Sequence, residues 1–128
     1  MIDWETLIAA AKKVRENAYA KFSGFEVGAA LLTGTGKIIT GCNVENSSFG
    51  LTMCAERTAV FKAVSEGEKD FAAIVIVSSA NPPARPCGAC RQVLFEFNPD
   101  LEIVCANIAG VVDKFTLKDL LPEGFRLR

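Results

Sequence analysis

The chain contains five cysteines and no histidine, and three of the cysteines fall in two short motifs, Cys54-Ala55-Glu56 and Pro86-Cys87-Gly88-Ala89-Cys90. A catalytic metal here must therefore be held largely by thiolate, and the fold has to bring two separate segments together around one ion. Three cysteine ligands leave one position of a tetrahedral zinc site open, which distinguishes a catalytic zinc from a structural one. Glu56 is placed where it could move protons at that position.

The other two cysteines, Cys42 and Cys105, raise the alternative of a closed site with a fourth cysteine ligand. Cys42 stands between Gly41 and Asn43 on a predicted strand, and Cys105 lies in an apolar predicted strand. Free cysteine is among the residue types that are most often buried. We therefore interpret both as core residues, and a closed structural zinc site is the alternative.

The three thiolates would more than neutralise a zinc dication, so a positive group is expected beside them. The N-termini of the two helices predicted to carry the ligands supply partial positive charge. Arg57 and Arg91, each next to a motif residue, are the candidate side chains, and we favour Arg57 for charge compensation. The alternative for either arginine is a solvated surface charge, and for Glu56 it is an exposed carboxylate in the first turn of a helix.

Composition limits the class of protein. The chain has 128 residues, of which 50% are hydrophobic and 23% charged, and we expect one globular domain over residues 1–128. No apolar run reaches the roughly 18 residues of a membrane span, and the acidic N-terminus does not resemble an export signal. We therefore expect a cytoplasmic protein with reduced cysteines. The net charge of −1 favours a small-molecule substrate over a nucleic acid.

Hydrophobic periodicity predicts alternating helices and strands, in an order that gives a mixed sheet covered by helices. The apolar, β-branched segment 71–78 is predicted to be the central strand, buried on both faces. Segments 25–32 and 37–44 are expected to pair as an antiparallel hairpin. Further strands are predicted at 101–106 and 111–115, and helices at 3–17, 54–65, 88–97 and 116–121.

Four separated blocks of the sequence resemble the cytidine deaminase family, specifically its short, homotetrameric, three-cysteine branch, and together they cover nearly the whole chain. The Cys-x-Glu and Pro-Cys-x-x-Cys pair is similar to the signature of zinc-dependent deaminases. The blocks are FSGFEVGAAL at 22–31, GCNVEN at 41–46, CAERTA at 54–59 and PCGACRQV at 86–93.

The resemblance implies an α/β fold, a three-layer α-β-α sandwich with a mixed five-stranded sheet. It implies that Cys54, Cys87 and Cys90 bind one Zn²⁺ per subunit. The implied activity is hydrolytic deamination of cytidine and deoxycytidine to uridine and deoxyuridine, with release of ammonia, in pyrimidine salvage. Glu56 would carry the proton from water to N3 and on to the leaving amine.

The resemblance also implies a substrate site. Asn43 and Glu45 would hydrogen-bond the ribose hydroxyls, because adjacent sugar oxygens need a donor and an acceptor at fixed positions. Phe25 would pack against the pyrimidine, with plain core packing as the alternative, and the backbone of Ala55 would contact the base edge. In this family a neighbouring subunit of the homotetramer completes the site, and Phe125 resembles the aromatic residue that it contributes.

Two departures from the family bear on specificity rather than on chemistry. Phe49 stands where many relatives have a tyrosine, so a phenolic hydrogen bond toward the 5′ end of the sugar is missing, and Phe22 likewise replaces a common tyrosine.

Two other functions remain open: a deaminase of a cytosine-nucleoside antibiotic and a non-catalytic, zinc-stabilised binding module. A nucleic-acid editing deaminase is disfavoured by the short, acidic chain.

Overall fold

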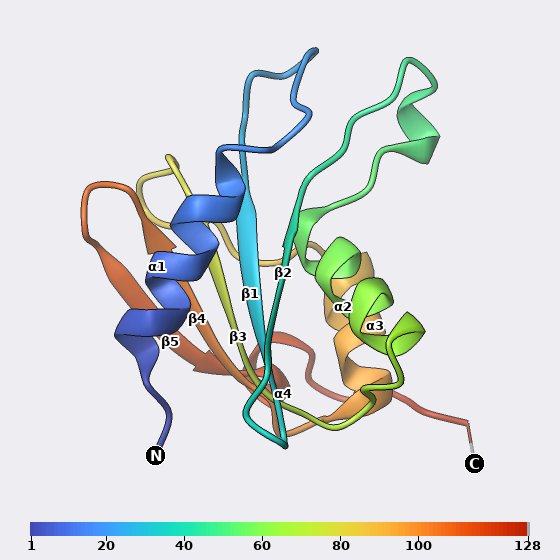
Figure 1. Ribbon diagram of the computed structural model, residues 1–128. Coiled ribbons are helices and arrows are strands. Elements are labelled where there is room, and N and C mark those ends of the chain that lie inside the picture. The colour runs from blue at the N-terminus through green and yellow to red at the C-terminus, as the bar shows by residue number, and fades with distance from the viewer. Residues whose placement is uncertain (128) are drawn as a thin grey trace.

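A mixed five-stranded sheet forms the centre of the molecule, for which a computed structural model describes residues 1–127. The strand order is β2-β1-β3-β4-β5, and of the neighbouring strands within these residues only β3 and β4 run parallel (Figure 1). The apolar strand β3 is central and almost fully buried, as its sequence predicts. The strands are β1 Gly28–Thr33, β2 Ile38–Cys42, β3 Phe71–Ser78, β4 Glu102–Asn107 and β5 Val112–Thr116.

Helices cover both faces of this sheet, as the three-layer prediction requires. Helix α1 (Trp4–Arg15) packs on one face over a core that includes Leu7 and Ala11. Helices α2 (Ala55–Ser65) and α3 (Gly88–Phe97) lie side by side on the other face (Figure 1). A second hydrophobic core lies between these two helices and the sheet. The short α4 (Leu117–Leu120) packs against it through the buried side chain of Leu117. None of the helices within residues 1–127 combines the length and apolarity needed to cross a membrane.

Two glycines let the helices approach the strands closely. A Cβ atom built on Gly41 of β2 would lie 2.5 Å from the backbone nitrogen of Ala59 and 2.7 Å from the carbonyl oxygen of Ala55, both in α2. On the other face, a Cβ atom on Gly28 of β1 would lie 2.0 Å from the carbonyl oxygen of Ala11 in α1. The backbones of β2 and β1 therefore lie directly against those of α2 and α1. This close packing fixes the position of both helices, including the N-terminal turn of α2.

The first predicted strand is shorter than expected, because residues 25–27, here called the strap, do not pair as a strand. The side chain of Asn43 pairs with their backbone instead. Its Oδ1 accepts from the Val27 N–H over 2.9 Å, and its Nδ2 donates to the Phe25 carbonyl over 2.8 Å. A short 3-10 helix, η1 (Phe49–Leu51), lies between β2 and α2.

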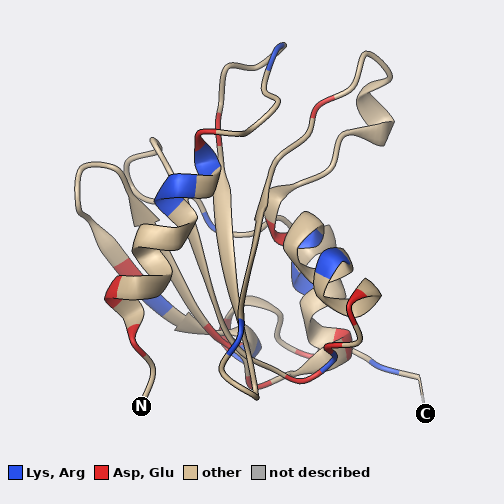
Figure 2. Cartoon of the chain, viewed as in Figure 1, with Lys and Arg blue, Asp and Glu red and all other residues tan. Residues whose placement is uncertain are grey.

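Charged side chains are distributed over several elements rather than gathered on one. Figure 2 shows lysine and arginine interspersed with aspartate and glutamate on the helices and loops. Within residues 1–127 no element carries a long basic run, consistent with the net charge of −1 for the whole chain. This distribution agrees with the expectation of a small-molecule ligand.

Candidate metal centre

Three cysteine sulfurs converge where the N-termini of α2 and α3 meet. Cys54 is the N-cap residue of α2, Cys87 is the N-cap residue of α3, and Cys90 lies in the first turn of α3. The Sγ atoms of Cys54 and Cys87 are 3.8 Å apart, those of Cys87 and Cys90 are 3.5 Å apart, and all three lie within 4.8 Å of one another. Tetrahedral zinc with bonds of about 2.3 Å separates its sulfur ligands by about 3.8 Å. The cluster therefore fits zinc.

The other cysteines do not take part in this cluster. Cys105 is fully buried in β4, and burial raises the pKa of its thiol to about 12. Cys42 ends β2 and is half-buried. Among residues 1–127 the ligand group contains three cysteines and no fourth, so the closed four-cysteine alternative finds no support.

Arg57 lies beside the thiols, as charge compensation requires. Its Nη2 donates to the Sγ of Cys54 over 3.5 Å. The hydrogen bond from Cys90 lowers the pKa of the Cys54 thiol, and the contact with Arg57 lowers it further. The N-termini of both helices add partial positive charge at the same place. These contacts therefore favour the thiolate form of Cys54.

Arg91, the other candidate for charge compensation, has a structural role. Its Nε donates to the carbonyl of Pro86 over 2.7 Å, and its Nη1 donates to the carbonyl of Leu120 over 2.7 Å. These contacts tie the residue before Cys87 to the end of α4. The side chain is therefore neither a free surface charge nor a contact of the sulfurs.

Glu56 lies in a cavity of about 180 Å³ beside the cluster. The residue is only 5% exposed, and burial raises the pKa of its carboxyl group to about 7. A carboxyl group with such a pKa can both accept and release a proton near neutral pH. The residues lining the cavity are Phe25, Val27, Asn43, Cys54, Ala55, Glu56, Ile76, Ala84, Arg85 and Cys87.

Asn43 and Glu45, predicted to bind a ribose, both already make hydrogen bonds within the chain. The amide of Asn43 faces the cavity and holds the strap. The carboxylate of Glu45 accepts from the amides of Phe22 and Ser23, each over 3.0 Å, and from the Ser23 hydroxyl. It lines a neighbouring hollow of about 400 Å³ with Phe22, Ser23, Phe49 and Thr52 rather than the cavity of Glu56.

Phe125, like Glu45, is a predicted substrate contact that lies away from the cavity of Glu56 in its own chain. Its side chain does not line that cavity, the residue is 65% exposed, and its carbonyl accepts from Nε2 of Gln92 on α3 over 3.1 Å. The C-terminal segment thus lies against the helix that carries Cys87 and Cys90. A role for Phe125 in substrate binding requires a second subunit.

Sequence reasoning missed Arg85, which lines the cavity from the loop before Cys87. Its Nη2 lies 3.2 Å from the Asp113 carboxylate, and its guanidinium stacks 4.9 Å from the ring centre of Phe115. Its Nη1 donates to the carbonyl of Pro83 over 2.7 Å. Arg85 therefore links the loop that forms part of the cavity wall to β5. In the sequence, the feature that distinguishes this arginine is its position among prolines.

Comparisons with known proteins point to one family. A model of the cytidine and deoxycytidylate deaminase zinc-binding region matches residues 1–106. The chain is 50% identical over 125 residues to a cytidine deaminase of Sporosarcina psychrophila, covering 97% of this chain and 92% of the relative. The crystal structure of cytidine deaminase from Burkholderia pseudomallei, 52% identical, superposes with a TM-score of 0.93 over 98% of this chain and 100% of that one.

A relative with a different substrate is also similar. Over 104 residues the chain is 36% identical to a blasticidin-S deaminase of Bacillus cereus, covering 75% of this chain and 74% of the relative. The similarity therefore includes a deaminase named for another substrate, although at lower identity and over a shorter alignment.

Proposed function

The chain belongs to the cytidine and deoxycytidylate deaminase family, and we propose that it hydrolyses cytidine and deoxycytidine to uridine and deoxyuridine with release of ammonia. The observation that carries this function is the buried carboxyl group of Glu56 in the same cavity as Cys54 and Cys87. Two sulfur ligands and a proton carrier thus line the space that receives the substrate. The enzyme takes one Zn²⁺ per subunit.

Zinc, when bound by Cys54, Cys87 and Cys90, lowers the pKa of water and so supplies a nucleophile near neutral pH. Glu56 accepts a proton from the attacking water and delivers it to N3 of the pyrimidine. Glu56 then takes the remaining proton from the hydroxyl group now on C4 and passes it to the departing amine, so that the bond from C4 to nitrogen breaks, the C4 carbonyl forms and ammonia leaves. Arg57 offsets the excess negative charge of the three thiolates.

The walls of the cavity orient the nucleoside. Phe25 packs against the pyrimidine face, and the backbone of Ala55 hydrogen-bonds the base edge. Asn43 has one amide hydrogen and one carbonyl lone pair left after it binds the strap, so it can still contact a ribose hydroxyl. Glu45 accepts from a second hydroxyl in place of, or beside, the Ser23 hydroxyl.

The same family membership supports a proposal for the assembly of the enzyme and its place in the cell. We infer a single catalytic domain over residues 1–128 and a homotetramer in which Phe125 of one subunit completes the site of its neighbour. The exposed position of Phe125 on the C-terminal segment supports this arrangement. The enzyme acts in the cytoplasm in pyrimidine salvage, on free nucleosides rather than nucleic acids or membranes.

The direct test is to incubate the purified, zinc-containing protein separately with cytidine, deoxycytidine and blasticidin S and to measure deaminated product and ammonia. We expect stoichiometric uridine or deoxyuridine and ammonia from the first two substrates. Turnover of blasticidin S alone would favour the antibiotic-nucleoside deaminase. No turnover of any of the three would favour the zinc-stabilised binding module.

A further inference from the structure

The strap makes one backbone hydrogen bond, from the Asn43 N–H to the Val27 carbonyl over 3.3 Å, and is otherwise held by side chains from two sides. Asn43 binds the Val27 N–H and the Phe25 carbonyl, as described above. The carbonyl of Glu26 lies between these two contacts and needs a partner of its own, because unpaired backbone groups away from water are unfavourable. Phe25 and Val27 line the cavity, so whatever holds the strap shapes that wall.

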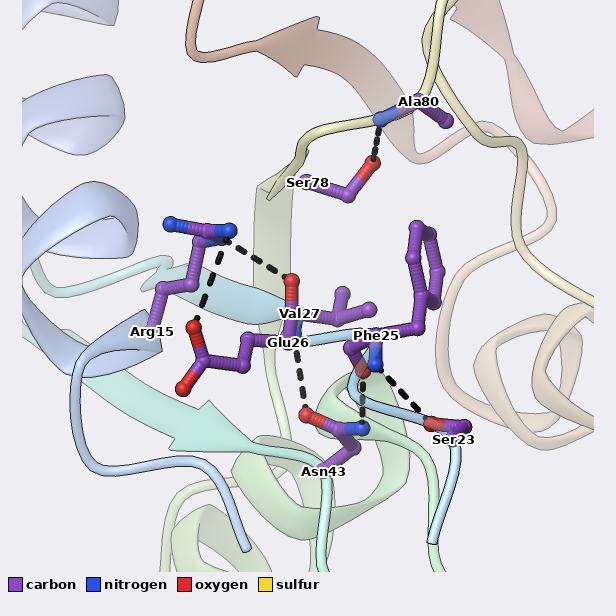
Figure 3. A network of polar contacts seen from close by, with 8 residues as sticks. All are labelled: Arg15, Ser23, Phe25, Glu26, Val27, Asn43, Ser78 and Ala80. Carbon is purple, nitrogen blue, oxygen red and sulfur yellow. Dashed lines mark hydrogen bonds and ion pairs between the residues drawn. The ribbon is translucent and has the colours of Figure 1, made fainter. Parts of the chain in front are cut away.

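Arg15, at the C-terminal end of α1, supplies the missing contact. Its Nε donates to the carbonyl of Glu26 over 2.9 Å, and its Nη2 lies 3.8 Å from Oε1 of the same residue. Its side chain is 19% exposed, whereas that of Glu26 is 42% exposed. Figure 3 shows Glu26 pointing toward Arg15 while the ring of Phe25 points away from it.

The packing of α1 brings Arg15 within reach of the strap. A Cβ atom on Gly28, the first residue of β1, would lie 2.9 Å from both the backbone nitrogen and the Cβ atom of Arg15. The helix end therefore lies directly against the start of the strand that follows the strap. The contact between Arg15 and Glu26 closes the intervening loop, residues 16–25, at its base.

We propose that Arg15 is a positioning residue for substrate binding, which fixes the strap from the face of the sheet opposite the cysteine cluster. The inference rests on the proposed function, since it names a determinant of that same site. Arg15 touches neither the sulfurs nor Glu56 and acts through the backbone on Phe25 and Val27. It therefore sets the affinity for the pyrimidine and leaves proton transfer unchanged.

Two measurements test this role in the zinc-containing protein: the steady-state kinetics of cytidine deamination and the hydrogen exchange of backbone amides. In Arg15→Ala we expect KM to rise roughly tenfold, because a charge-assisted hydrogen bond is lost, while kcat stays within about twofold. The Val27 amide should exchange roughly tenfold faster, and that of Val75 in central β3 should be unchanged. Arg15→Lys, which keeps a donor and the charge, should restore part of both effects.

Two control variants separate positioning from general stability. Leu7→Ala removes a buried side chain from the same helix and should lower stability without raising KM or speeding exchange at Val27. Glu26→Gln keeps the backbone carbonyl that Arg15 binds, so its KM should match that of the wild type. An equal rise in KM in Leu7→Ala, or unchanged KM in Arg15→Ala, would overturn the proposal.

The exchange measurement keeps this inference distinct from the proposed function. If the wild type does not deaminate cytidine, the function fails, and the exchange rates alone decide whether Arg15 holds the strap. Faster exchange at Val27 in Arg15→Ala but not in Leu7→Ala would support the contact. Equal exchange rates in the wild type and Arg15→Ala would refute it.

Discussion

Arg57 and Cys54 lie one helical turn apart at the start of α2, and the guanidinium Nη2 of Arg57 donates to the sulfur of Cys54 over 3.5 Å. The arginine is therefore supplied by the same helix that supplies a metal ligand. Its Nε atom is buried and has no hydrogen-bond partner among residues 1–127, and contact with Cys54 raises the pKa of the guanidinium. This geometry supports the proposed role of Arg57 in balancing the charge of the thiolates.

Replacing Arg57 with alanine should weaken zinc binding by about 10–100-fold, as is typical for residues that support a metal ligand without binding the metal. The physical reason is that the excess charge of three thiolates loses its nearest compensating cation. Zinc affinity can be measured by competition with a chromophoric chelator. The control is Lys62→Ala, since Lys62 is an exposed cation on the same helix. Equal zinc affinity in Arg57→Ala and the wild type would contradict the role of Arg57.

Gly41→Ala should destabilise the fold by about 2 kcal/mol, because the added Cβ atom would lie 2.5 Å and 2.7 Å from backbone atoms of α2. The helix can relieve this contact only by moving as a unit, which displaces the residues at its start. Urea unfolding measures the loss of stability. The matched control is Gly50→Ala, where an added Cβ atom has nothing within 4 Å. Similar stabilities for the two variants would show that α2 does not pack as described.

The hydrogen bonds of Glu45 predict a pH dependence. The Ser23 hydroxyl, followed by the Ser23 amide, lowers the pKa of Glu45 in the folded protein. A carboxylate with a depressed folded-state pKa stabilises the fold above its unfolded-state pKa of about 4.3 and loses that contribution as pH falls through the folded-state pKa. The loop at Phe22 and Ser23 should therefore stay ordered at neutral pH and loosen only in acid.

The amide chemical shift of Ser23, followed by NMR during an acid titration, measures this transition. We expect its midpoint below pH 4.3, the usual glutamate value, and we expect no such transition in Glu45→Gln. A midpoint above that value would mean that the carboxylate is not stabilised by these hydrogen bonds.

The convergence of the three cysteines could be predicted from the sequence because local rules position each of them. Cys54 precedes a helical pattern, and the spacing of Cys87 and Cys90 places both sulfurs at one helix end, so only the packing of two helices had to be inferred. The central position of β3 was equally predictable from its continuous apolar run. These features depend on short segments of sequence.

The strap and Arg85 were not predictable, because their partners are distant in the sequence. The alternating pattern of apolar and charged residues at 25–27 looks the same whether the backbone pairs with a strand or with the side-chain amide of Asn43. Arg85 owes its position to Asp113 and Phe115, which only the pairing of β4 with β5 brings near. The proposed role of Phe125 depends on a second subunit, whose position a sequence pattern does not give.

The central claim is that Glu56 transfers the protons in a zinc-dependent deamination. Its most direct test compares Glu56→Gln with the wild type in cytidine turnover, followed by the loss of cytidine absorbance, with the zinc content of both proteins measured. Glutamine preserves the shape of the side chain but cannot accept and return a proton, so the variant should keep its zinc and lose turnover by roughly 10²–10⁴-fold or more. Equal turnover in two zinc-replete proteins would contradict the account.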